Sequence, residues 1–192
     1  MSLIEAVQQQ NEPQVKALLA QSVDIDAQNE KGETVLLIAT HQNDIAIAKM
    51  LIDAGADINK QDAIEDSAYL YAGAQGKTEI LAYMLAHHEP DQTIVNRYGG
   101  NALIPAAEKG HLANVKLLLE DGRADINHQN SFGYTALIEA VALTDGSKVY
   151  QDIAKELLKH HADTKLRDNN GKTALDYANE KGYTELQTLL KK

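Results

Sequence analysis

The chain has 192 residues, with 28 acidic side chains against 18 basic ones and a formal net charge of −10 at pH 7. An acidic surface repels phosphate backbones, and the chain contains no tryptophan and only 5% aromatic residues, so we expect no nucleic-acid partner. The absence of cysteine excludes disulfides, thiolate metal ligands and thiol catalysis.

The sequence contains no run of about 18 apolar residues, so it predicts no membrane-spanning helix and no membrane partner. It also lacks a basic stretch followed by an apolar core near its start, so we expect no signal peptide and a cytoplasmic protein. A predicted helix begins almost at once, at residues 3–9. A targeting segment upstream of these residues therefore stays an open alternative.

The first predicted repeat, residues 1–28, starts directly with a helix, and its glutamines provide the polar surface that a terminal repeat needs. The stretch 29–61 has the full pattern of a turn, a helix at 34–42 and a second helix at 45–53. Thr34 is a suitable N-cap, because its hydroxyl accepts hydrogen bonds from the first turn of a helix. Both helices are shorter than the roughly 12–15 residues that an isolated helix needs in water, so they require neighbours.

This pattern returns along the chain. N-cap formers stand 33, 34, 34 and 38 residues apart, at Thr34, Ser67, Asn101, Thr135 and Thr173. A small residue recurs in the first helix, at Ala39, Ala72, Ala106, Ala140 and Ala178. A large apolar residue recurs in the second helix, at Leu18, Leu51, Met84, Leu118, Leu157 and Leu190. A period near 33 with a turn and two helices indicates a repeat array.

The remaining predicted repeats cover residues 62–95, 96–129, 130–167 and 168–192. The third has Glu65 in place of the turn glycine, and the fourth has Pro105 in its first helix. The fifth holds about five extra residues within Leu143–Tyr150, an insertion that a loop tolerates at low entropic cost. The sixth ends after its second helix with the polar character of a C-terminal cap.

These repeats resemble the ankyrin repeat family over essentially the whole chain. The resemblance rests on turn-to-helix segments such as Gly32–Leu36, Gly133–Leu137 and Gly171–Leu175, the helix join Glu108–Leu112 and the closing segment Asp53–Asn59. The Pro and His that the family often places in its first helix are absent. The resemblance implies an all-α fold, an ankyrin-repeat solenoid of about six helix-turn-helix repeats with short β-turn fingers. It also implies one domain spanning residues 1–192.

No pattern of catalytic or metal-binding residues emerges. The pairs His87-His88 and His160-His161 suggest a metal site, but adjacent residues on a helix point in different directions and no carboxylate-rich cluster matches them. The Asp-Xaa-Asp pairs recur with the repeat and are typical of turns. No glycine loop is followed by a phosphate-binding lysine, and no nucleophile elbow is present. We therefore expect no catalytic residue, metal or cofactor.

The candidate binding residues lie at the turn tips. The residue before each turn glycine, or before Glu65, is apolar or aromatic in three successive repeats, at Ile64, Tyr98 and Phe132. Arg97 and Tyr134 flank this series, and Tyr71 takes the first-helix position of Ile38. Exposed tips are normally polar, so we predict partner contacts at Ile64, Tyr71, Arg97, Tyr98, Phe132 and Tyr134. The alternative is that these side chains fold back onto neighbouring turns.

The resemblance implies a non-enzymatic module that binds another protein through its turn tips and concave groove. We expect a monomer whose partner has a basic surface, because the chain is acidic. One alternative is a dedicated inhibitor or regulator of a single enzyme. Two others are an enzyme with a site in the groove, which needs converging titratable groups, and a structural spacer, which needs no partner.

Overall fold

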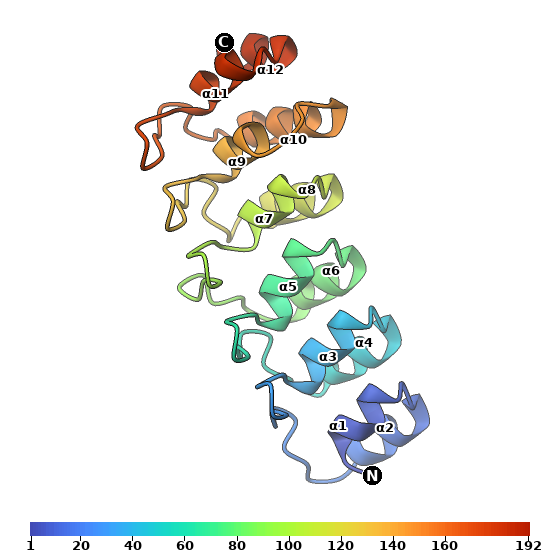
Figure 1. Ribbon diagram of the computed structural model, residues 1–192. Coiled ribbons are helices and arrows are strands. Elements are labelled where there is room, and N and C mark those ends of the chain that lie inside the picture. The colour runs from blue at the N-terminus through green and yellow to red at the C-terminus, as the bar shows by residue number, and fades with distance from the viewer. The chain divides into compact units, whose positions relative to one another are not determined.

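The computed structural model describes residues 1–192 and contains twelve α-helices and no β-strand, as the sequence predicts (Figure 1). The helices are α1 (Leu3–Gln8), α2 (Glu12–Leu19), α3 (Val35–His41), α4 (Ile45–Asp53), α5 (Ala68–Ala74), α6 (Thr78–His87), α7 (Leu103–Glu108), α8 (Leu112–Asp121), α9 (Ala136–Ala142), α10 (Lys148–Lys159), α11 (Ala174–Lys181) and α12 (Thr184–Leu190). None of them combines the length and the hydrophobicity that crossing a bilayer requires.

The predicted N-caps hold the first helix of five repeats. The hydroxyls of Thr34 and Thr135 each accept a hydrogen bond of 3.1 Å from the backbone amide three residues later. Ser67, Asn101 and Thr173 make the equivalent bond at 3.1, 3.2 and 3.2 Å. Each bond satisfies an amide that has no partner within the helix.

Contacts between Cα atoms group the chain into two units. Unit 1 comprises Met1–Ala72 and Lys77–Arg97, and unit 2 comprises Gly73–Gly76 and Tyr98–Lys192. In unit 1, α1 packs on α2 and α3, and α4 packs on α3 and α6. In unit 2, α7, α9 and α11 pack in succession, as do α8, α10 and α12. Within each unit, connecting loops project from the same side of the helix pairs (Figure 1). The single domain over residues 1–192 stays a prediction.

The core lies between the helices of neighbouring repeats. The recurring alanines at 39, 72, 106, 140 and 178 are fully buried, so the first helices approach closely. The recurring large residues are buried as well, except Leu18, which is partly exposed. Leu18 lines a cavity of about 300 Å³ with Leu3 and Val23 of the first repeat and Val35 of the second.

The insertion of the fifth repeat forms an ordered loop between α9 and α10. The Tyr183 hydroxyl, from the sixth repeat, donates a hydrogen bond of 2.6 Å to the Thr144 carbonyl. Gly146 lies against the Tyr183 ring so closely that an added Cβ would come within 2.7 Å of a ring carbon. The loop is therefore packed against the following repeat.

Candidate functional site

In four repeats an Asn or Asp side chain builds the turn by accepting hydrogen bonds from the backbone ahead of it. In the fifth repeat, Asn130 Oδ1 accepts hydrogen bonds of 3.0 Å from the amides of Phe132 and Tyr134. The equivalent pair of bonds is made by Asn29, Asp62 and Asp168. Because the side chain replaces part of the backbone pairing of a turn, the residue at the tip is held by its own amide.

The residue after the tip adopts a left-handed conformation in every complete turn. Gly133 has a φ of +77°, and a Cβ added to it would lie 2.7 Å from the Asn169 nitrogen. Glycine there satisfies both the backbone conformation and the close approach of the next turn. Glu65 takes the same place in the third repeat with a φ of +65°, which explains how that turn forms without glycine.

The tip residues are fixed through their carbonyl groups as well. In unit 2, the Tyr98 carbonyl accepts a hydrogen bond of 2.9 Å from the Ser131 amide, and the Phe132 carbonyl accepts one of 3.0 Å from the Asn169 amide. The side chains project outward from this fixed backbone. Ile64 is 55% exposed, Tyr98 52% and Phe132 53%, so each tip presents a large side chain to solvent.

The other predicted binding residues lie near these tips, in two separate groups. In unit 2, the Tyr134 ring is half-buried and its centroid lies 6.0 Å from that of Phe132. In unit 1, Arg97 Nη1 lies 3.3 Å from the Ile64 carbonyl oxygen and 3.7 Å from Asp66 Oδ2. The series Ile64, Tyr98 and Phe132 includes residues of both units, and its use as one binding surface stays a prediction.

Tyr71 lies on α5, away from the turn tips. Its half-buried ring meets the His41 ring edge-on, with centroids 4.2 Å apart. Burial and, to a smaller extent, the negative charge of Asp66 raise the pKa of Tyr71, so its hydroxyl stays protonated at neutral pH. Tyr71 therefore packs against the end of α3, the first helix of the preceding repeat.

Sequence reasoning missed the buried carboxyl group of Glu139 on α9. Its side chain is 6% exposed, and Asn130 Nδ2 donates a hydrogen bond of 2.9 Å to Glu139 Oε1. Burial, together with the nearby negative charge of Glu108, raises the pKa of Glu139 to about 7. The available signal was a charged residue at the first-helix position that Ile38 and Tyr71 occupy in other repeats.

A recurring glutamine also escaped notice. Gln61 Nε2 donates hydrogen bonds to the carbonyls of Glu65, in the same turn, and Val95, in the next repeat, at 2.7 and 2.8 Å. Gln28 and Gln129 make the same pair of bonds in their repeats. The three glutamines stand at the same position before their turns, and this shared position was the signal available in the sequence. These side chains tie each turn to the one that follows.

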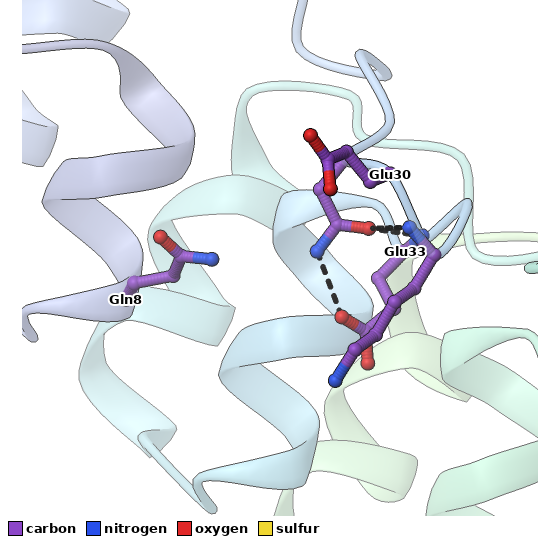
Figure 2. Close-up of a pocket in the computed structure, with 5 residues that line it drawn as sticks. Gln8, Glu30 and Glu33 are labelled. Carbon is purple, nitrogen blue, oxygen red and sulfur yellow. Dashed lines mark hydrogen bonds between the residues drawn. The ribbon is translucent and has the colours of Figure 1, made fainter.

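A cavity of about 300 Å³ lies beside the turn of the second repeat, lined by Gln8, Asn29, Glu30, Lys31 and Glu33. Figure 2 shows Gln8 across the cavity from Glu30 and Glu33. Asn29 Nδ2 donates a hydrogen bond of 2.8 Å to Glu33 Oε2, and Glu33 Oε1 lies 3.3 Å from His41 Nδ1. The cavity is therefore polar and carries two carboxylates.

The histidine pairs considered as metal ligands make other contacts. His88 Nε2 lies 2.9 Å from the Ile52 carbonyl oxygen, and His87 Nδ1 lies 2.8 Å from the Tyr83 carbonyl oxygen. His161 has a φ of +66°, the left-handed conformation typical of a residue that ends a helix. No group of three or more His, Asp or Glu side chains is arranged to hold a metal ion.

Paired helices joined by turns at a fixed period define a repeat protein, and comparisons with known proteins identify the class. The family model for ankyrin repeats, in three copies, matches residues 2–62, 55–130 and 106–192. The ankyrin repeat protein YahD of Escherichia coli (strain K12) is 40% identical, over 96% of this chain and 92% of its own. The chain belongs to the ankyrin repeat family.

Solved structures agree with this assignment. The crystal structure of the ankyrin repeat protein EF0377 has a TM-score of 0.98 and 61% identity, covering 99% of this chain and 96% of its own. That of an ankyrin repeat domain from Acinetobacter baumannii AYE has a TM-score of 0.94 and 47% identity, covering 98% and 95%. Ankyrin repeats are generally protein–protein interaction modules, and the fold is typically non-enzymatic.

Proposed function

We propose that this chain is a non-enzymatic module that binds another protein through its turn tips. The observation that carries the proposal is Phe132, the only phenylalanine of the chain, which stands 53% exposed on a turn whose backbone is bonded on both sides. A large ring held outward in a single backbone conformation is the kind of anchor that dominates protein interfaces.

Three features of unit 2 support Tyr98, Phe132 and Tyr134 as contact residues. The backbone of Phe132 is hydrogen-bonded through its amide and its carbonyl, so little conformational freedom is lost on binding. Tyr98 and Phe132 occupy the same position in successive, hydrogen-bonded turns. Tyr134 adds a second ring beside Phe132. In unit 1, Ile64 and Arg97 form a smaller apolar and cationic contact of the same kind, with Tyr71 behind it on α5.

The chemistry of the partner follows from charge. The chain carries ten more acidic than basic residues, so we propose a partner with a basic surface. Opposite charges steer such a pair together and raise the association rate at low ionic strength. We further propose that the module acts as a monomer in the cytoplasm.

The proposal is tested by comparing partner capture with matched variants. Immobilised wild-type protein, Phe132→Ala and Asn170→Ala are each exposed to a lysate of the source cell, and the retained proteins are quantified by mass spectrometry. Asn170 is an exposed residue at the same turn position in the sixth repeat. A protein retained by the wild type and Asn170→Ala but lost with Phe132→Ala supports the proposal.

Truncation of a true anchor lowers affinity by at least about 2 kcal/mol, whereas an exposed ring contributes little to folding. Denaturant unfolding of Phe132→Ala should therefore match the wild type. If Phe132→Ala retains every partner and instead loses stability like a core variant, the ring serves packing and the binding site lies elsewhere.

A further inference from the structure

The acidic charge of the chain is concentrated in unit 1. Unit 1 has fifteen acidic residues against six basic ones, a formal net charge of −9. Unit 2 has thirteen against twelve, a formal net charge of −1. A basic partner is therefore attracted by unit 1, and the aromatic tips of unit 2 contribute contacts of another kind.

Within unit 1, two carboxylates occupy the same position in consecutive turns. Glu33 follows the turn glycine of the second repeat, and Asp66 holds the equivalent place in the third. The His41 ring contacts Glu33 and Tyr71, because its Nδ1 atom lies 3.3 Å from Glu33 Oε1 and the ring meets the Tyr71 ring edge-on. The negative charge of Asp66 contributes to the raised pKa of Tyr71. The four residues Glu33, His41, Tyr71 and Asp66 span two consecutive repeats of unit 1 and are called the strip below.

The two carboxylates of this strip differ in their neighbours. Arg97, from the turn of the next repeat, places Nη1 3.7 Å from Asp66 Oδ2. The position that Arg97 holds in the fourth repeat is held in the third by Ala63, whose amide donates a hydrogen bond of 3.0 Å to the Lys31 carbonyl beside Glu33. The chain thus supplies a guanidinium to Asp66 from the following turn, whereas the equivalent position in the turn after Glu33 carries no basic side chain.

Glu33 borders a cavity that Gln8 of the preceding repeat also lines. The cavity has a volume of about 300 Å³, and its lining adds the Glu30 carboxylate and the amide groups of Gln8 and Asn29 (Figure 2). Carboxylates and amide oxygens accept the hydrogen bonds that a guanidinium or an ammonium group donates. Lys31 also lines the cavity, but it is an exposed side chain on a turn tip.

We propose that a basic segment of the partner protein docks on this strip and places an arginine or lysine side chain in the cavity, where it pairs with Glu33. This inference rests on the proposed function, because it specifies the kind of partner. The half-buried Tyr71 ring adds an aromatic group to the strip, and aromatic rings attract cations, so a second basic side chain is favoured there. The two contacts together select a segment with more than one basic residue.

The test uses a peptide with arginine recurring among glycine and serine, titrated into ¹⁵N-labelled protein and followed by NMR. We expect the amide signals of Lys31, Glu33 and His41 to shift. Glu33→Gln should lower the affinity for the peptide about fivefold, which is the upper range for one partly exposed ion pair. Ala63→Arg brings a guanidinium from the following turn that competes for the Glu33 carboxylate, so it should lower the affinity for the peptide as strongly. Ala63→Gln adds length without charge and should leave the affinity unchanged.

A charge-matched variant separates a defined contact from general attraction. Glu12→Gln removes one exposed carboxylate of unit 1 on the outer helix α2. The inference is overturned if Glu12→Gln weakens the peptide as much as Glu33→Gln, or if Glu33→Gln and Ala63→Arg have no effect. The spectra of the free variants report whether each remains folded. Failure of the proposed function would show in partner capture by Phe132→Ala, in unit 2, and not in this titration.

Discussion

Asn130 Nδ2 donates a hydrogen bond of 2.9 Å to Oε1 of the buried Glu139, nine residues further along the chain. In the next repeat the equivalent residues are Asp168 and Tyr177, and the direction of the bond is reversed, because the Tyr177 hydroxyl donates to the Asp168 carboxylate. Donor and acceptor have changed places together. Both pairs tie a turn to the first helix behind it.

This exchange predicts a pair of compensating substitutions. Asn130→Asp alone places a carboxylate against the buried Glu139 and should lower the free energy of unfolding by about 1–3 kcal/mol, the cost of a buried polar group that loses its donor. Asn130→Asp with Glu139→Tyr recreates the pairing of the sixth repeat and should recover part of that loss. A double-mutant cycle from denaturant unfolding measures the coupling, and strictly additive losses would contradict it.

The stability of the protein should depend on pH through Glu139. Its pKa rises from 4.5 to about 7 in the folded state, so the folded protein binds more protons than the unfolded chain between these values. The stabilisation is fully present below the unfolded pKa and is lost as pH rises through about 7. Glu139→Gln should therefore flatten the fall in unfolding free energy between about pH 4.5 and pH 7. Glu120→Gln, an exposed carboxylate on α8, should leave that slope unchanged.

Two glycines with the same conformation should respond differently to alanine. Gly133 and Gly171 have φ values of +77° and +75°, but an added Cβ meets the Asn169 nitrogen at 2.7 Å in the first and nothing within 4 Å in the second. Gly171→Ala should cost about 1–2 kcal/mol from backbone conformation alone. Gly133→Ala should lower the free energy of unfolding clearly more. If thermal unfolding gives equal losses for the two variants, the close approach of Asn169 to Gly133 does not contribute to stability.

Core truncations test whether neighbouring repeats share their stability. Leu51→Ala and Leu118→Ala, on the second helices α4 and α8, should each cost about 2–5 kcal/mol, because each leaves a cavity between repeats. Leu190→Ala, on α12 in the last repeat, should cost less, since it packs on one neighbouring repeat only. Three equal losses in denaturant unfolding would argue against this additive organisation.

The sequence by itself determined the repeating pattern of a turn and two helices, together with its N-caps. Thr34, Thr135 and Thr173 cap their helices through hydrogen bonds to the amide three residues later, so both partners of each bond lie close together in the sequence. The helical period and the fixed step between repeats likewise depend on local pattern alone. This is why the array of turns and paired helices could be predicted from residue spacing, while the resemblance to the family implied the ankyrin fold.

Only the tertiary structure decided which polar side chains meet and which are buried. Arg97 contacts Asp66 and Gln61 contacts Val95, and each pair comes from two different turns. Glu139 is charged by residue type, yet the helices packed against α9 bury it and shift its pKa. Burial and electrostatics depend on atoms brought together by stacking, and identical positions in different repeats have different neighbours. The residue pattern therefore located the turns, and the packed neighbours decided the chemistry of each one.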